Sequence, residues 1–244
     1  MSHALCEGDH VTMAAPPDRF HPDLLAGCDE PVRRFFAHAV RTGAPLAGTR
    51  LTMAGRIKVG AWLPFVAEQT ADGRSFSWRA RVGWGPIRPL RVDDEYADGV
   101  GRTAGRLFGR LRLFAAQDDD TARSAAGRAA LESVAFAPAS VLPQAGVAWR
   151  AEADDLVVAR FDLPPEQPEV RVGIDEVGAV RAVSALRWGK AGGTYEYVPC
   201  GSLVSAERDF GDLVLPSELE VGWWFGTPRY APFFTARVER VTHA

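Results

Sequence analysis

FSWRARVGW, from Phe76 to Trp84, alternates apolar with polar or small side chains along its whole length. Because successive side chains of an extended chain point to opposite faces, this period of two predicts a β-strand. One face of the strand carries three aromatic rings, and the other carries Arg79 and Arg81. The segment therefore predicts a sheet with one large apolar surface, which a helix, a second sheet or a ligand must cover.

The same alternation recurs along most of the chain. LTMAGRIKV (51–59) and WLPFVAEQT (62–70) precede the aromatic strand. An Asp-Gly turn at 72–73 predicts that the strand at 62–70 and the aromatic strand form a hairpin. Only two long helices are predicted, one beginning at Asp29 and an alanine-rich one over 120–137. Further strands are expected at 88–96, around 100, and at 147–149, 156–163, 170–174, 180–188, 194–198, 219–225 and 233–241.

The order of these elements predicts the fold class. Parallel strands would need a helix between most of them, whereas about ten strands here follow one another directly. We therefore expect an α+β fold, in which a large curved antiparallel sheet, a half-barrel or open barrel, carries two main helices over its concave face. Residues 1–28 are polar and predicted to be a flexible tail, and 29–244 a single β-rich domain.

Composition limits the partners that are expected. The net charge of −3 predicts no general attraction to nucleic acid or to an anionic membrane. No apolar run approaches the roughly 18 residues of a membrane span, and the absence of a signal peptide predicts a cytoplasmic protein. Three cysteines and five histidines lack metal-ligand spacing, so neither a metal nor a cofactor is predicted. Seven Trp and 13 Phe favour an apolar pocket.

Three segments resemble an uncharacterised bacterial protein family: LVLPSELEVGWWFGTPRYAPFFTARV (213–238), WLPFVAEQ (62–69), and FAPASVLP (136–143) followed by Trp149. The resemblance extends over about Glu30 to Val241. In fold, such proteins are similar to the lipoprotein-carrier group, in which a curved half-barrel holds lipid or another apolar ligand beneath its helices. The resemblance thus implies a scaffold for a hydrophobic ligand, and it implies no catalytic residues. Unlike the carrier group, this chain shows no secretion signal.

Glu68 is the ionisable residue of greatest interest. On an extended WLPFVAEQT it shares a face with Trp62. If that face lines a pocket, the carboxyl group lies in apolar surroundings and suits proton transfer. If the face meets solvent, or if Glu68 pairs with Arg79 or Arg81, its role is structural, and this is the expectation.

Other candidates are aromatic. Tyr195 and Tyr197 lie two apart on one strand, so both hydroxyl groups could orient a ligand carbonyl. The adjacent Trp223 and Trp224 must face opposite sides of a strand. The acidic run 93–95 is expected to be a solvated turn. The predicted ligand-binding residues are Trp62, Phe76, Trp78, Trp84, Trp188 and Trp224, and the catalytic ones, if the protein is an enzyme, are Glu68, Tyr195, Tyr197 and Arg81.

Three functions remain open on the sequence alone. The first is binding of an apolar small molecule or acyl chain in a cavity of the curved sheet. The second is a cofactor-independent cyclase or isomerase acting on a hydrophobic intermediate, since such a site needs few polar residues. The third is a protein-interaction module that uses an exposed tryptophan. A carbon-lined pocket favours the first function, and a pocket containing Glu68 favours the second.

Overall fold

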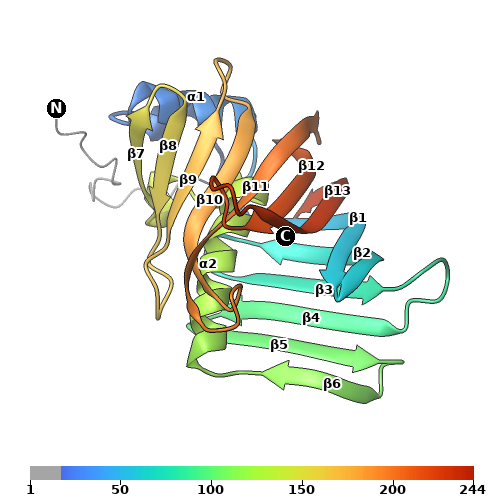
Figure 1. Cartoon of the computed structure of the whole chain (residues 1–244). Coiled ribbons are helices and arrows are strands. Elements are labelled where there is room, and N and C mark those ends of the chain that lie inside the picture. Colours follow the sequence, from blue (N-terminus) through green and yellow to red (C-terminus); the bar gives the residue numbers. More distant parts are fainter. Residues whose placement is uncertain (1–17) are drawn as a thin grey trace.

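The computed structural model describes residues 18–244, which form one curved antiparallel sheet with two long helices (Figure 1). The sheet has 13 strands in the order β6-β5-β4-β3-β2-β1-β13-β12-β11-β10-β9-β8-β7. Their bounds are β1 Thr49–Val59, β2 Ala61–Ala71, β3 Phe76–Val82, β4 Leu90–Ala97, β5 Val100–Leu107, β6 Leu111–Ala116, β7 Ala148–Ala153, β8 Leu156–Arg160, β9 Glu169–Ile174, β10 Val180–Gly189, β11 Glu196–Asp209, β12 Val214–Trp223 and β13 Ala231–His243.

The predicted α+β class with a large curved antiparallel sheet is confirmed. Strands that follow one another in sequence are neighbours in the sheet, except β6 and β7, which lie at its two edges, and β1 pairs with β13 at its centre. The strand number exceeds the predicted ten partly because the sequence predicted a strand around residue 100, where β5 begins, but none at 111–116, where β6 lies. The turn of their hairpin is at Phe108 and Gly109, which both have positive φ angles (51° and 71°). In two-residue hairpin turns these angles are usually found with the sequence Asn-Gly.

Helix α2, Asp119–Phe136, lies across the concave face. The Asp118 carboxylate caps it, because Oδ1 accepts hydrogen bonds from the backbone N–H (2.8 Å) and hydroxyl (2.6 Å) of Thr121. Its many alanines let it approach the sheet closely. A Cβ at Gly101 of β5 would lie 2.5 Å from the carbonyl oxygen of Thr121, so only glycine fits there.

Helix α1, Glu30–Ala39, covers the β7–β8 end of the sheet. Its apolar stripe is buried, as the spacing predicts, and Phe35 stacks on Trp149 of β7 with ring centroids 5.4 Å apart. Short 3₁₀ helices complete the described chain at η1 Pro22–Leu25, η2 Pro138–Ser140 and η3 Pro143–Ala145. Of the helices in residues 18–244, none has the length and apolar character needed to cross a bilayer.

The predicted boundary of the folded part at residue 28 lies too late in the chain. Phe20 and Leu25 are buried in the same hydrophobic core as α1, and the backbone of Phe20 hydrogen-bonds Ala44 at 2.8 Å. The polar composition of this stretch concealed these two anchoring side chains. The remainder of the predicted tail, residues 1–17, lies outside the described residues.

Candidate functional site

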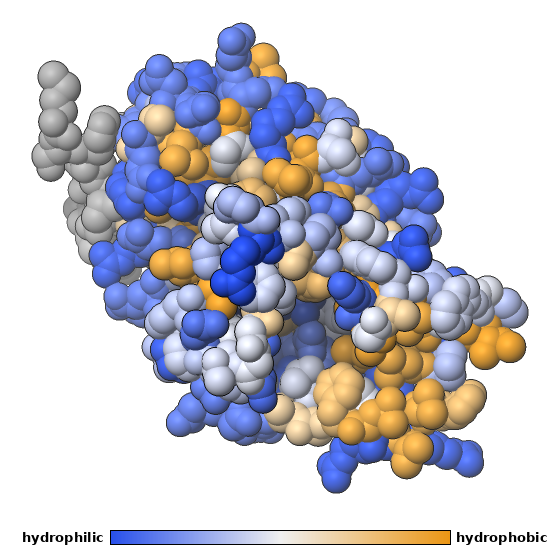
Figure 2. Space-filling view, in the orientation of Figure 1, coloured by the Kyte–Doolittle hydropathy of each residue, from blue (hydrophilic) through white to orange (hydrophobic). Residues whose placement is uncertain are grey.

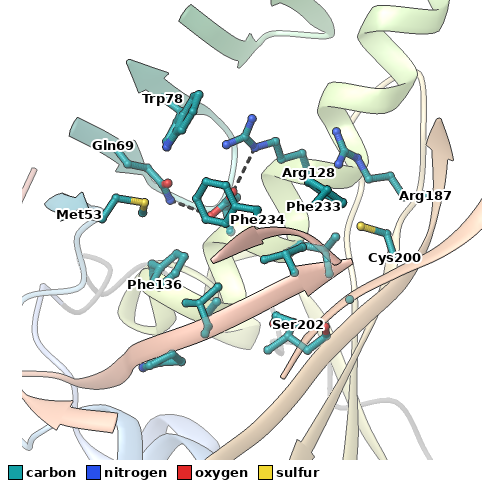
Figure 3. A pocket seen from close by; sticks show the side chains of 18 of the residues that line it. Met53, Gln69, Trp78, Arg128, Phe136, Arg187, Cys200, Ser202, Phe233 and Phe234 are labelled. Carbon is teal, nitrogen blue, oxygen red and sulfur yellow. Dashed lines mark hydrogen bonds and ion pairs between the residues drawn. The ribbon is translucent and has the colours of Figure 1, made fainter. Parts of the chain in front are cut away.

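A cavity of about 280 Å³ lies between the concave face of the sheet and α2 (Figure 3). Most of its wall is carbon, contributed by strands from both halves of the sheet. The apolar lining residues are Met53 and Ile57 of β1, Trp78 of β3, Val92 of β4, Leu131, Ala135 and Phe136 of α2, Val183 of β10, Val204 of β11, Pro216, Leu219, Val221 and Trp223 of β12, and Phe233 and Phe234 of β13. Such a wall suits an apolar ligand.

Trp78, the tryptophan of β3, belongs to this wall. Trp78 is 1% exposed and packs edge-on against Phe65 of β2, with ring centroids 5.6 Å apart. Phe65 in turn stacks on Phe234 at 4.9 Å. Offset and edge-to-face ring pairs hold one another in defined orientations. The three rings therefore form a rigid side of the cavity where β2, β3 and β13 meet.

A charged network crosses one side of the cavity and is centred on Arg128 of α2. Arg128 Nη1 donates to Asp94 Oδ2 of β4 at 2.6 Å, and its Nε donates to Glu132 Oε1 at 3.1 Å. Gln69 Nε2 of β2 donates to the other oxygen of Glu132 at 2.8 Å. Burial opposes the positive charge, but the two carboxylates outweigh it, so the pKa of Arg128 is raised above its usual value.

Arg187 of β10 is the second guanidinium at the cavity. Its Nε and Nη2 donate to the carbonyl oxygen and hydroxyl of Ser124 on α2, at 3.0 and 3.2 Å. The guanidinium lies over the ring of Trp223, 5.3 Å from its centroid. Within residues 18–244 no carboxylate forms an ion pair with Arg187. This positive charge is therefore uncompensated by a direct partner in the described chain.

Two further polar atoms at the cavity wall are buried and unpartnered among the described residues. They are Oε1 of Gln69, an acceptor, and Nε1 of Trp78, a donor. The two residues are directly opposite one another on β2 and β3. A buried polar atom without a hydrogen bond costs about 1–3 kcal/mol, so both atoms favour a ligand that carries a polar group.

Cys200 of β11 also lines the cavity. Its thiol is buried, and this burial raises its pKa, although the neighbouring Arg187 acts in the opposite direction. The side chain is therefore a neutral, weakly polar part of the wall rather than a nucleophile.

Two of the predicted ligand-binding residues face this region. Trp78 lines the cavity itself. Phe76 is buried beneath the Arg128 guanidinium, 5.0 Å from ring centroid to Cζ, and lines a smaller adjoining hollow. Both follow from the alternation that predicted the apolar face of β3.

Trp62 and Glu68 lie on the other face of the sheet. Phe65, Ala67 and Gln69 occupy the inward positions of β2, which leaves Glu68 exposed and opposite Arg79 of β3. Trp62 is half-buried outside the cavity. An acid–base role of Glu68 required its face of β2 to line the pocket. The cavity lies on the opposite face of β2.

Trp84, Arg81 and Trp224 are also outside the cavity. Trp84 is 65% exposed in the loop after β3, and Arg81 is exposed on the outer face of that strand. Trp224 lies in the turn after β12 at φ 54°, with the Arg229 guanidinium 4.5 Å from its ring centroid. Its neighbour Trp223 is the tryptophan that reaches the cavity.

Trp188, Tyr195 and Tyr197 gather in a separate cluster around Arg123 of α2. The guanidinium lies 3.6 Å from the Trp188 ring centroid and donates to the Tyr197 hydroxyl at 2.9 Å. That hydroxyl donates to Glu166 at 2.7 Å, and Tyr195 stacks on Trp188 at 6.3 Å. The structure therefore does not bring the four predicted catalytic residues together.

The sequence interpretation missed the polar residues of the site. Arg128, Leu131, Glu132 and Ala135 follow one another at helical spacing, and this stripe of α2 lines the cavity. That spacing was visible, but an Arg–Glu pair four residues apart on a helix is usually solvated. Asp94, expected in a solvated turn, instead projects inward from the middle of β4. No local signal distinguished Arg187 from other strand arginines.

Comparison with known proteins adds a family and two distant structures. A DUF1329 family protein from Desulfovibrio piger is 8% identical, with 91% of each chain covered and a TM-score of 0.44. A LolA superfamily protein from Nitrosomonas europaea is 7% identical over 82% of this chain and 87% of its own, with a TM-score of 0.45. Comparison with curated proteins finds no match.

The predicted resemblance to an uncharacterised family is confirmed. The sequence profile of a family of unknown function, DUF6544, matches residues 18–236, which include both helices and nearly the whole sheet. The chain therefore belongs to the DUF6544 family.

Proposed function

We propose that this protein binds a small amphipathic molecule, with its apolar chain in the cavity beneath α2 and its polar head beside Arg187. The observation that carries the proposal is the cavity itself. It is lined mostly by carbon, and the Arg187 guanidinium at its wall has no carboxylate partner in residues 18–244. Apolar surface removed from water contributes about 25 cal/mol per Å² before the costs of binding.

The dimensions of the cavity limit the ligand. Its 280 Å³ lies just below the range of about 300–1,000 Å³ found for small-molecule pockets. A medium-length acyl chain is therefore a better candidate than a lipid with two long chains. Decanoate is a suitable probe, because it joins one flexible apolar chain to one carboxylate.

The polar atoms of the wall support a proposal for the head group. Arg187 can donate to an oxygen acceptor, and Trp78 Nε1 is an unpartnered donor at the same cavity. Charge-assisted hydrogen bonds to a carboxylate are roughly twice as strong as neutral ones. We therefore favour an acidic head group over a neutral one. The cyclase alternative depended on Glu68, and no observation at the cavity favours it.

Native mass spectrometry of protein purified from its own source tests the proposal directly. We expect an adduct of one small amphipathic molecule per chain, which exchanges with added decanoate. Leu131→Trp should abolish the adduct, because a larger ring at this position of α2 occupies the cavity. Leu186→Trp is the matched control, since Leu186 is 64% exposed and does not line the cavity. An adduct that survives Leu131→Trp unchanged would contradict the proposal.

A further inference from the structure

Two neighbouring loops at one end of the sheet expose large apolar side chains to solvent. They are the β3–β4 loop, 83–89, and the β5–β6 turn at 108–110, joined by a hydrogen bond from Phe108 N–H to the Pro89 carbonyl (2.7 Å). Trp84, Ile87 and Phe108 are 65, 69 and 72% exposed. The apolar patch at the lower right of Figure 2 lies where Figure 1 draws these loops. We call this region the loop surface.

Phe108 is held in a backbone conformation that a bulky residue rarely adopts. Its φ of 51° lies in the left-handed region, where Gly, Asn and Asp are favoured. A large side chain there costs free energy, on the order of 1 kcal/mol. The ring has no compensating burial, since it projects into solvent. Because the Phe108 ring does not stabilise the fold at this position, we infer that it contacts another molecule.

Arginines run in register across the four strands beside these loops. Arg81 lies opposite Arg91, Arg91 opposite Arg106, and Arg106 opposite Arg112. Like charges directly opposite on neighbouring strands are destabilising. Segments 81–93 and 105–113 together contain six arginines and one acidic residue, Asp93. The Asp93 carboxylate forms ion pairs with Arg91 at 3.0 Å and with Arg106 at 3.5 Å. The loop surface is therefore strongly positive although the whole chain carries −3.

A hollow of about 300 Å³ combines both features. It is lined by Arg81, Ile87, Arg88, Pro89, Arg91, Phe108 and Gly109. Nε of Arg88 is buried with no hydrogen-bond partner among residues 18–244. Guanidinium groups suit phosphate oxygens, and the adjoining carbon suits the chain attached to a phosphate.

We propose that the loop surface docks the protein on an anionic lipid bilayer. Trp84, Ile87 and Phe108 enter the interfacial region, and the arginines contact lipid phosphates, as in interfacial protein segments that combine apolar and basic residues. The charge complementarity and the position of the apolar side chains on loop tips, rather than in a groove, favour a bilayer over a folded protein partner. This inference is independent of the cavity and goes beyond the proposed function.

Vesicle co-sedimentation tests the docking. We expect binding to phosphatidylcholine vesicles containing about 30% phosphatidylglycerol, weak binding to phosphatidylcholine alone, and a decrease as salt rises. Arg81→Gln with Arg112→Gln should weaken binding about 25-fold, since each arginine near an anionic surface contributes roughly fivefold. Phe108→Asn should weaken it about tenfold while the melting temperature stays the same or rises, because Asn accepts a positive φ.

Matched variants at the opposite end of the fold serve as controls. Arg33→Gln on α1 removes an exposed arginine, and Val177→Ser removes a side chain that is 65% exposed in the β9–β10 turn. Both should bind vesicles as the parent protein does, and all variants should still bind decanoate. Equal binding to neutral and anionic vesicles, or loop variants that bind unchanged, would overturn the proposal. So would a dimer in gel filtration that Phe108→Asn dissociates, which would assign the loop surface to a second copy.

Discussion

Arg128 and Arg187 have different roles although both line the same cavity. Arg128 forms ion pairs with two carboxylates, and Gln69 extends this network to β2. Arg187 donates to the neutral groups of Ser124, and no carboxylate forms an ion pair with it in the described chain. Both guanidinium groups therefore link α2 to the sheet, and Arg187, which has no carboxylate partner in residues 18–244, is the one that we propose meets the head group of a ligand.

The structural role of Arg128 is measurable by mutation. Arg128→Met should lower the free energy of unfolding by about 3 kcal/mol, because it leaves two largely buried carboxylates without their counter-ion. Denaturant titration measures this change. The control is Arg171→Met, whose more exposed pair with Glu152 should contribute under about 1 kcal/mol. Equal losses in the two variants would refute a special role for Arg128.

The ligand-binding role of Arg187 predicts a difference between head groups. Arg187→Gln should weaken decanoate binding at least tenfold, since a hydrogen bond between charged groups contributes about 1.5–3 kcal/mol. Binding of decanol should change little, because a hydroxyl group gains less from the positive charge. Displacement of a fluorescent probe gives both affinities. Equal weakening for acid and alcohol would contradict an acidic head group.

Among the elements, α2 determines which face of the sheet lines the cavity. Its alanines allow close approach at Gly101, and its Arg128–Ala135 stripe closes the cavity. The sequence predicted this helix and its small-residue face. It did not predict the orientation of β2, because WLPFVAEQT is apolar on both faces and only the position of α2 distinguishes them.

The N-cap of α2 predicts a pH dependence of stability. The hydroxyl and backbone N–H of Thr121 lower the pKa of Asp118 below its ordinary value of 3.8. Because the pKa of Asp118 is lower in the folded than in the unfolded state, its carboxylate stabilises the protein at pH values above the unfolded-state pKa. This stabilisation is lost as the pH falls through the folded-state pKa. Asp118→Ala should therefore cost about 1 kcal/mol at neutral pH. Thermal unfolding against pH should show parent and variant converging in acid, and a constant difference would contradict the cap.

At the scale of the whole molecule, alternation predicted the sheet better than it predicted the site. The apolar face of β3 placed Trp78 correctly on the concave side. Arg187 could not be assigned from its own strand, because it reaches the cavity only when the sheet curves and brings β10 under α2. The β5–β6 hairpin was missed because Leu-Phe-Gly-Arg at 107–110 lacks a typical turn signal.

Isothermal titration calorimetry with decanoate at several temperatures tests the central claim, that the cavity beneath α2 binds an apolar chain. The parent protein and Leu186→Trp should bind one molecule with a negative heat-capacity change, the signature of buried apolar surface. Leu131→Trp should give no saturable heat. Saturable binding of the same affinity in Leu131→Trp, or no binding in the parent protein, would contradict the claim.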